Sequence, residues 1–349
     1  MRIGERAISP DEAVYVIAEI GVNHDGDPWR AQELVRAAGE AGADAVKFQY
    51  FETDRLMSAG AKLAAYQSAA GETDPIAMLR RLELSLDDLA RAVDLAHGLG
   101  LHAILTVFST ELVGPASRLA WDAFKSASPD VIHRPLLEAM AGTGRPLIVS
   151  TGASTPPEVN GAADWLREYP DVAFLHCVSS YPAPDPALGG IAAVAKITGR
   201  ATGYSDHTES VQTGALAVSA GALLLERHLT YDRSAAGPDH AASLEARDFA
   251  RYAHLAREAR TGINETRFKP DKRVLACERD VRRVSRQSVV AARDLAPGEV
   301  LGEADLTCKR PGEGIAPHRL PELIGRMVTR AVGADTALKP GDVEGFGSG

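Results

Sequence analysis

Short apolar runs alternate with longer amphipathic stretches from the N-terminus to about residue 262. Each apolar run is six or seven residues long, which is the length of a buried strand. Between the runs lie stretches such as 28–42 and 86–100, in which apolar residues recur at helical spacing of three and four. The pattern predicts eight strands, at 14–20, 44–49, 102–108, 123–128, 146–151, 172–178, 201–206 and 222–228.

Eight strand-then-helix units in about 260 residues are typical of an α/β fold, the closed (β/α)8 TIM barrel. Pro28 stands where a first helical turn is expected, which supports the helix that follows it. The alternative is a doubly wound open sheet, which has fewer strands and a glycine-rich first turn. The run EIGVNHDG at 19–26 does not match that glycine pattern. The sequence therefore favours the barrel.

Two segments depart from this rhythm. Residues 50–85 lengthen the connection after the second strand, on the face where barrels carry their active sites. From about residue 263 the chain becomes rich in charge, and then shows short strand-like runs with turns at PGE, PGEG and KPGD. We therefore expect a catalytic barrel at 1–265, a linker at 266–284 and a small β-rich domain at 285–349.

Composition narrows the class of protein. The net charge of -9, without a basic run, argues against a nucleic-acid partner or an anionic membrane surface. Cys177, Cys277 and Cys308 are scattered and odd in number, which indicates a reducing, cytoplasmic location and no disulfide framework. No segment reaches the roughly 18 apolar residues of a spanning helix. The pattern is that of a cytoplasmic enzyme.

Polar or charged residues stand at the end of every predicted strand. In TIM barrels the catalytic groups lie at these carboxyl ends. One polar strand end is easily explained by solvation, but eight together predict a polar pocket. These residues are Glu19, Lys47, Gln49, Thr106, Lys125, Ser128, Ser150, Thr151, His176, Ser179, Ser205, Asp206, His207, Glu226 and His228.

Two histidines end consecutive strands, His207 in GYSDHTES and His228 in LLLERHLT. Neighbouring parallel strands lie about 4.8 Å apart, so the two imidazoles can share one metal ion. Two nitrogens with oxygen ligands from water and substrate suit Mn²⁺, Co²⁺ or Mg²⁺, and Zn²⁺ is compatible. The alternative is a pair of hydrogen-bonding histidines without a metal, and the spacing alone does not decide between them.

Lys47 and Lys125 lie inside otherwise apolar strands, where a lysine is costly unless it meets an anion. They are therefore candidates for binding a phosphate or a carboxylate. The alternatives are buried ion pairs, for instance Lys47 with Glu19, or a Schiff-base lysine tuned by burial. Asp239 and His240 follow the eighth strand in a Gly-Pro turn, where they are either turn residues or ligands of polyol hydroxyls.

Several motifs in this order resemble the sialic acid synthase family, which includes N-acetylneuraminate synthases and spore coat polysaccharide synthase-like proteins. The motifs are AEIGVNHDG, GADAVKFQ, STGAS, HCVSSYPAP, GYSDHT, ERHLT and GPDHAASL, and the tail segment KRPGEGI resembles the C-terminal antifreeze-like (SAF) domain of that family. The resemblance covers nearly the whole chain. It implies condensation of phosphoenolpyruvate (PEP) with an N-acyl hexosamine-type aldose to give a nonulosonic acid.

The resemblance also implies roles for single residues. His207 and His228 match the metal ligands, with Mn²⁺ as the expected ion and Mg²⁺ or Co²⁺ as alternatives. Glu19 and Asp239 match carboxylates at the reacting sugar, and Tyr181 matches a residue of the sugar-facing loop. The positions that match the PEP site are Lys47, Gln49, Thr106, Lys125, Ser128, Ser150 and Ser205.

Arg310 in KRPGEG matches an arginine that the SAF domain delivers to the sugar site of a partner subunit, which implies a domain-swapped homodimer. Four residues depart from the family pattern and leave the sugar open: Ser126, Pro129, His133 and Ser179. Two other functions suit the same barrel. One is a metal-dependent pyruvate aldolase, which releases no phosphate, and the other is a non-catalytic carbohydrate-binding or coat-associated protein.

Overall fold

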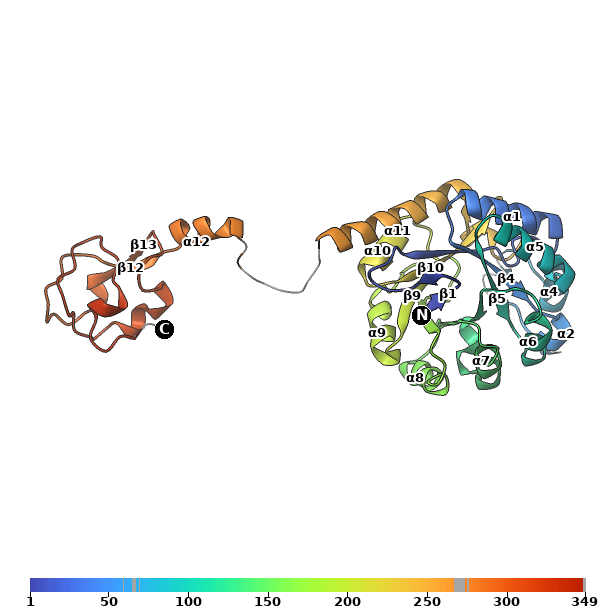
Figure 1. The fold of residues 1–349 in the computed structure, drawn as a ribbon, viewed down its shortest axis with the longest axis horizontal. Coiled ribbons are helices and arrows are strands. Elements are labelled where there is room, and N and C mark those ends of the chain that lie inside the picture. The colour runs from blue at the N-terminus through green and yellow to red at the C-terminus, as the bar shows by residue number, and fades with distance from the viewer. Residues whose placement is uncertain (59, 65–66, 69, 267–273, 275, 348–349) are drawn as a thin grey trace. The chain divides into compact units, whose positions relative to one another are not determined.

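The computed structural model describes residues 1–58, 60–64, 67–68, 70–266, 274 and 276–347. The chain divides into two compact units, Met1–Phe268 and Lys269–Gly349 (Figure 1). In the first unit, eight parallel strands follow one another in chain order, and the last pairs with the first to close a barrel. The strands are β3 (Tyr15–Glu19), β4 (Ala45–Tyr50), β5 (His102–Val107), β6 (Ala123–Ser126), β7 (Leu147–Ser150), β8 (Val172–Cys177), β9 (Ala201–Asp206) and β10 (Leu224–Thr230). The predicted (β/α)8 barrel is confirmed, because each strand begins and ends within two residues of its predicted run.

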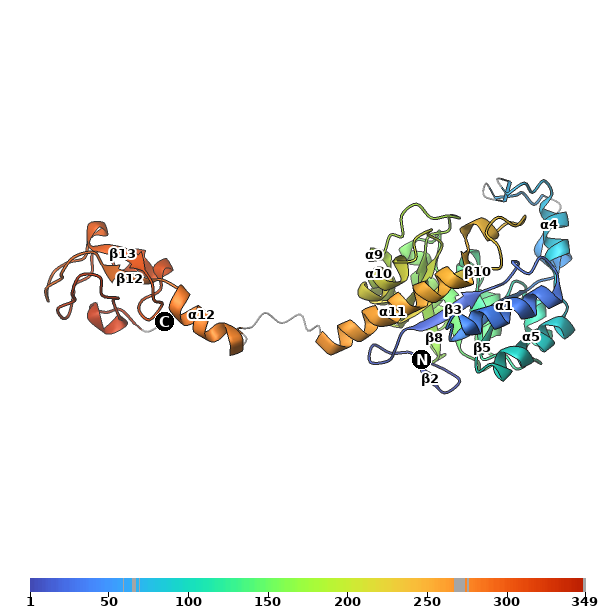
Figure 2. The same cartoon turned by 90° about the horizontal axis from the view of Figure 1, so that it is seen from above.

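Helices cover the outside of the barrel (Figures 1 and 2). They are α1 (Pro28–Glu40), α5 (Leu86–Gly98), α6 (Thr110–Ala116), α7 (Arg134–Ala141), α8 (Pro156–Trp165), α9 (Gly189–Thr198), α10 (Thr213–Ser219) and α11 (Ala246–Thr266). Pro28 opens α1 as expected, and the Asp27 side chain accepts a hydrogen bond from the backbone N–H of Trp29. This cap satisfies a donor that the first helical turn leaves unpaired.

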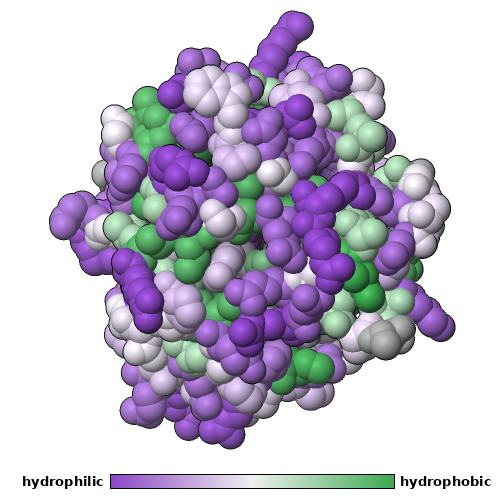
Figure 3. Space-filling view, turned by 90° about the vertical axis from the view of Figure 1, so that its right-hand side faces the viewer, coloured by the Kyte–Doolittle hydropathy of each residue, from purple (hydrophilic) through white to green (hydrophobic). Residues whose placement is uncertain are grey.

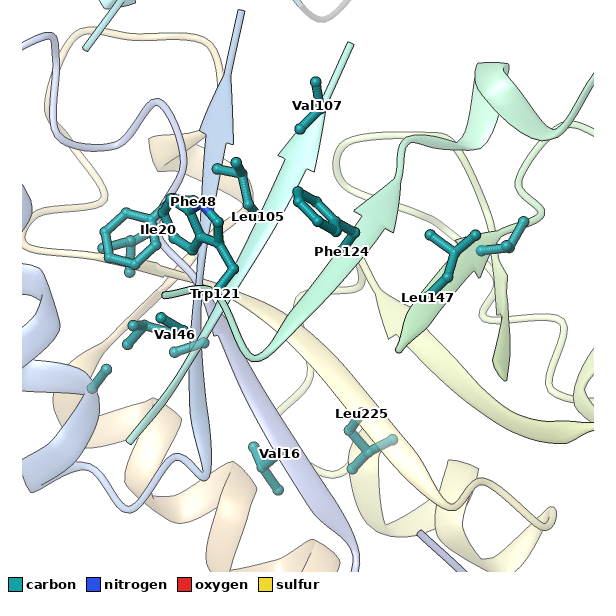
Figure 4. Packing of buried hydrophobic residues seen from close by; sticks show 14 of the residues in the cluster. Val16, Ile20, Val46, Phe48, Leu105, Val107, Trp121, Phe124, Leu147 and Leu225 are labelled. Carbon is teal, nitrogen blue, oxygen red and sulfur yellow. The ribbon is translucent and has the colours of Figure 1, made fainter. Parts of the chain in front are cut away.

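Alternation along the strands separates the barrel into an inside and an outside. Outward residues such as Val16, Val46, Phe48 and Phe124 pack in the main cluster that lies between the sheet and the helices (Figure 4). Inward residues form a second apolar cluster that includes Tyr15, Ile17, Ala45, Ile104, Ala123, Ile148, Ala173, Leu175 and Leu224. Successive side chains of a strand point to opposite faces. The residue two positions further along each strand therefore also points into the barrel, and it lies between the inner apolar cluster and the carboxyl end of the barrel.

Smaller elements complete the first unit. The N-terminal hairpin of β1 (Arg2–Ile3) and β2 (Arg6–Ala7) adds Ile3 to the inner apolar cluster. After β4, the connection contains α2 (Thr53–Leu56) and α4 (Pro75–Leu82), and Phe51, Met78 and Leu82 form a separate apolar cluster with Val22. Beyond β10 come a short 3-10 turn (His240–Ala242) and β11 (Leu244–Glu245), which pairs parallel to β10. A further 3-10 turn, Ser128–Ile132, follows β6.

The second unit is a small domain with its own apolar core. Helix α12 (Arg279–Ser285) precedes strand β12 (Ser288–Ala291), which pairs antiparallel with β13 (Leu306–Lys309). Single β-bridges tie the remaining loops, for example Leu295 to Val332 and Val328 to Val343. Four short 3-10 turns lie at Ala276–Glu278, Glu303–Asp305, Pro317–Glu322 and Pro340–Asp342. The expected small β domain is confirmed, although most of its pairing is made by isolated bridges rather than by long strands.

Hydrophilic side chains cover much of the face in Figure 3, and hydrophobic ones lie among them in smaller groups. Among the residues that the structure describes, no helix combines the length and the apolar character that crossing a bilayer requires. The longest helix, α11, has 21 residues and carries charged side chains throughout.

Gly203 in β9 has no room for a side chain, because an added Cβ would overlap the carbonyl oxygen of Leu224 on the neighbouring strand. We expect Gly203→Ala to lower the free energy of unfolding by about 1–3 kcal/mol, measured by urea denaturation. Gly39→Ala in α1 is the control, since its Cβ would meet Leu101 at 3.5 Å, an ordinary contact. Equal stability of the two variants would contradict this view of the barrel interior.

Candidate active site

A cavity of about 400 Å³ opens at the carboxyl ends of the barrel strands. It begins one layer above the inner apolar cluster, where the inward residues become polar. The structure brings together almost all of the residues predicted for the site. Its polar lining consists of Glu19, Lys47, Gln49, Gln67, Thr106, Lys125, Ser128, Ser150, Ser179, Tyr181, Ser205, His207, Glu226, His228 and Asp239.

Two buried lysines occupy opposite sides of one carboxylate at the base of the cavity. Lys125 Nζ lies 3.3 Å from Glu226 Oε1, and Lys47 Nζ lies 4.0 Å from Glu226 Oε2. Lys47 also forms an ion pair with Glu19, as the alternative interpretation of this lysine predicted. The result is a layer of two lysine and two glutamate side chains, each at most 5% exposed.

Hydroxyl groups fix the ends of these lysines. Lys47 Nζ donates to Thr106 Oγ1 at 3.1 Å, and Lys125 Nζ donates to Ser150 Oγ at 2.8 Å. Ser205 Oγ donates to Glu226 Oε1 at 2.9 Å, so the central carboxylate is also held. Buried charges need such partners because desolvation is costly. The charged layer is therefore fixed in position by the protein alone.

Burial changes the protonation of this layer. It lowers the pKa of Lys47 to about 7, although the Glu226 carboxylate opposes the change. Burial would raise the pKa of Glu226, but Lys125 and Lys47 outweigh it, so that the pKa lies below the ordinary value. Burial raises the pKa of Asp239, higher in the cavity, to about 7, with Lys47 acting in the opposite direction. Shifts of this kind cluster at functional sites.

The two histidines meet at one side of the cavity. The ring centroids of His207 and His228 are 5.5 Å apart, and the ring of Tyr181 lies 4.2 Å from that of His207. His207 Nδ1 donates to the carbonyl oxygen of Val178 at 2.9 Å, so Nε2 is the acceptor nitrogen of a neutral ring, and Ser205 Oγ lies 3.5 Å from it. Burial lowers the pKa of His207 to about 4 and that of His228 well below its usual value. Both imidazoles are therefore neutral, which is the metal-binding form.

This pair fits a divalent cation with an incomplete protein shell. His228 Nδ1 is buried without a hydrogen-bond partner among the described residues, and Asp239 Oδ2 lies 3.5 Å away. The described parts of the chain contain no cluster of three or more His, Cys, Asp or Glu side chains arranged to hold a metal. The donor set is thus two nitrogens, and the remaining ligands of a cation would be oxygens from water or substrate.

Apolar side chains form one wall of the same cavity. The lining residues from the connection after β4 include Phe51, Leu56, Met78, Leu79 and Leu82, and Phe108 follows β5. The predicted insertion at 50–85 therefore does contribute to the active face. Its contribution is a hydrophobic surface beside the charged base, which suits a ligand with an apolar substituent.

Three of the polar strand-end residues do not face the cavity, which corrects the prediction that they contribute to the polar pocket. Thr151 donates to the carbonyl oxygen of Leu175, and His176 packs against Gly190 of α9 on the outer side of the sheet. Asp206 pairs with Arg227, which is also an outward residue. The reason is alternation, because the inward neighbours Ser150, Cys177 and Ser205 leave these positions on the opposite face.

Two of the four residues that depart from the family pattern, Ser126 and His133, do not line the cavity. His133 accepts a hydrogen bond from the backbone N–H of Leu136 as the cap of α7, and Ser126 is buried in β6. Pro129 and Ser179 do line the cavity. His240 is fully buried between Thr230 and Asp25 and is a structural residue of its loop.

The sequence missed the central position of Glu226, which it marked only as a strand end. The motif ERH could have shown that Glu226 points inward. Glu226 stands two residues before His228, and residues two apart in a strand lie on the same face. Arg310, at the end of β13, lies in the second unit and is exposed there.

Residues 34–267 match the NeuB family, and residues 286–344 match the SAF domain. N,N'-diacetyllegionaminic acid synthase of Legionella pneumophila is 36% identical over 334 residues, which cover 93% of each chain. N-acetylneuraminate-9-phosphate synthase of Homo sapiens is 31% identical, with coverage of 98% of this chain and 96% of that protein. The crystal structure of spore coat polysaccharide biosynthesis protein spsE from Bacillus subtilis matches with a TM-score of 0.66 at 28% identity, covering 98% of each chain.

These matches agree with the barrel, the second domain and the order of the motifs. The family match alone spans more than half of the chain. Its members are PEP-condensing transferases that make nonulosonic acids. This chain therefore belongs to the NeuB family of nonulosonic acid synthases and carries a C-terminal SAF domain.

Proposed function

We propose that this chain condenses PEP with the open-chain form of an N-acyl hexosamine-type aldose, giving a nonulosonic acid and inorganic phosphate. The observation that carries the proposal is the convergence of two buried lysines and two neutral histidines in one cavity. PEP carries a carboxylate and a phosphate, which match two cations. The aldehyde is a neutral carbonyl, and a cation held by the two histidines would polarise it.

Lys47 and Lys125 supply the positive charge for the two anionic groups of PEP. Both ammonium groups are already fixed by hydroxyls, so little reorganisation is needed when PEP binds. Gln49, Ser128 and Ser205 add polar side chains to the same lining. The charge of the base layer is balanced without a ligand, and PEP would therefore bind by drawing the lysines away from Glu19 and Glu226.

The reaction forms one carbon–carbon bond and breaks one carbon–oxygen bond. C3 of PEP attacks C1 of the aldehyde, whose oxygen takes up a proton. Water then adds to C2 of the former PEP, and the C2–O bond breaks to release phosphate. Glu19, which lines the cavity, would accept the proton of that water, the C2 hydroxyl would lose its proton to the departing phosphate to leave a ketone, and Asp239 would bind a sugar hydroxyl.

Membership of the NeuB family suggests a divalent metal, and we propose Mn²⁺, with Mg²⁺ or Co²⁺ as alternatives. When bound, the cation supplies Lewis-acid polarisation of the aldehyde. His207 and His228 would hold it. The Val178 carbonyl fixes the orientation of His207, and the ring of Tyr181 packs against that of His207.

The apolar wall supports an acylated sugar. Phe51, Met78 and Phe108 offer a surface on which a methyl-bearing acyl group can be buried beside the reacting aldehyde. We further propose, from the sequence resemblance, a homodimer in which Arg310 of one copy contributes to the sugar site of the other.

Phosphate release from PEP tests this function directly. With a panel of N-acyl amino-sugars, we expect release that depends on the sugar, and mass spectrometry should find an acid three carbons longer than the aldose. A pyruvate aldolase would instead condense pyruvate and release no phosphate. A carbohydrate-binding protein would bind a sugar without turnover.

His207→Ala and His228→Ala should each remove most of the activity while leaving the barrel folded, because each deletes half of the protein ligands for the cation. Phosphate release and circular dichroism measure the two effects. The control is His254→Ala, since His254 lies on α11 with its side chain 68% exposed. Full activity of either site variant after metal removal would contradict the assignment.

PEP use should weaken as the pH rises through about 7, because burial lowers the pKa of Lys47 to that value and its neutral amine no longer attracts an anion. The measurement is kcat/KM for PEP as a function of pH, which reports the free enzyme. Glu226→Gln should move the fall to lower pH, since the Glu226 carboxylate raises the pKa of Lys47. Glu138→Gln on α7 is the control. An unchanged profile in Glu226→Gln would argue against this role of Lys47.

A further inference from the structure

A buried ion pair lies on the outer face of the two strands that carry the histidines. Arg227 Nη1 is 3.0 Å from Asp206 Oδ1, and the two side chains are at most 1% exposed. The residues stand directly opposite each other in the ladder between β9 and β10. In sequence, each immediately precedes one of the cavity histidines, His207 and His228.

Stability alone does not explain this pair. Removing two charges from water is costly, and apolar pairs of similar volume are often at least as stable. The guanidinium group is also incompletely satisfied, since Nε and Nη2 of Arg227 have no hydrogen-bond partner among the described residues. The ring of Tyr252 lies 5.9 Å from the guanidinium carbon and offers only a weak contact. The Asp206–Arg227 pair is better explained if it positions the neighbouring residues of β9 and β10.

His207 is the residue that needs positioning, because β9 ends at Asp206 and the ladder does not extend to it. Asp206 Oδ1 accepts hydrogen bonds from the backbone N–H of Thr208 at 2.9 Å and from its hydroxyl at 2.8 Å. The Thr208 hydroxyl also contacts that of Thr213, the first residue of α10, at 2.8 Å. One carboxylate oxygen of Asp206 thus binds Thr208 on the far side of His207 and also Arg227 on the neighbouring strand.

Arg227 connects this turn to the second histidine. It bonds the Asp206 carboxylate and, through Nη1, the Asp206 carbonyl oxygen at 3.3 Å. The backbone of Arg227 leads directly into His228 on the neighbouring strand. The contacts between Arg227 and Asp206 therefore hold the end of β9 against β10, directly beside the two histidines.

We propose that Asp206 and Arg227 are positioning residues that hold the His207 and His228 imidazoles at the separation needed to share one divalent cation. The proposal rests on the metal site of the proposed function. Neither residue touches the cation or the substrates, because both side chains point away from the cavity. Outer contacts of this kind typically tune metal affinity by orienting the ligands.

The test is the affinity for Mn²⁺ alone, measured by isothermal titration calorimetry on the full chain. The double variant Asp206→Leu/Arg227→Met removes both charges together, so no lone buried charge remains. We expect Mn²⁺ affinity to fall about 10- to 100-fold, while circular dichroism and the thermal midpoint stay near those of the native chain. Native affinity in this variant would overturn the proposal.

The control is Asp44→Leu/Arg257→Met, which also removes both charges of an ion pair, here one whose Asp44 and Arg257 side chains are 22% and 33% exposed. Arg257 Nη2 also lies 3.0 Å from a carboxylate oxygen of Asp44, and that carboxylate also accepts from a backbone N–H, that of Val16. This pair lies at the start of the strands, remote from the histidines, so Mn²⁺ affinity should be unchanged. An equal loss of affinity in the control would show a general effect of barrel stability and overturn the positional role.

If the double variant Asp206→Leu/Arg227→Met does not fold, Thr208→Val tests the positional role instead. It keeps the ion pair and the side-chain shape but removes the hydroxyl that joins Asp206 to Thr213, and we expect a smaller but measurable loss of Mn²⁺ affinity. Unchanged affinity would contradict the proposal. If His207→Ala and His228→Ala bind Mn²⁺ as the native chain does, the metal site itself is wrong, which separates failure of the function from failure of the positioning.

Discussion

Alternation of side chains along eight closed strands is the constraint on which the rest of the structure depends. Each inward position of the barrel belongs to a layer, and the layers change from apolar to charged within two residues. Ile17 is followed inward by Glu19, Ala45 by Lys47, Ala123 by Lys125 and Leu224 by Glu226. A packed apolar floor thus supports a layer of charge whose side chains are held by one another and by hydroxyls.

The charged layer is balanced without a ligand, and this has a consequence for binding. Two carboxylates and two lysines share a space with almost no exposure, so the carboxylates and the ammonium groups offset each other's charge while both lysines are protonated. An incoming substrate must compete with Glu19 and Glu226 for the lysines. Such competition favours a ligand with two strong anionic groups over one with a single group, because only the former can replace both contacts.

The fold was predictable because its pattern is repeated eight times, so an error of one or two residues at a strand end does not change the architecture. The site was less predictable, since the same error decides whether a side chain points in or out. His176 and Asp206 were placed in the pocket for this reason, although each lies next to an inward residue. The central position of Glu226 was not predicted, because the sequence does not show that Lys47 and Lys125, which are distant along the chain, both contact its carboxylate. The bridged loops of the second unit have no clear period, so only its class could be predicted.

We propose that the two neutral imidazoles on adjoining strands would hold one divalent cation, and that Lys47 and Lys125 would bind PEP in the same cavity. Crystals grown with Mn²⁺ and PEP, with anomalous diffraction recorded at the manganese edge, test it most directly. The account predicts one strong anomalous peak within coordination reach of both His207 and His228, with PEP density beside Lys47 and Lys125. A peak elsewhere, or an ordered PEP remote from the lysines, would contradict it.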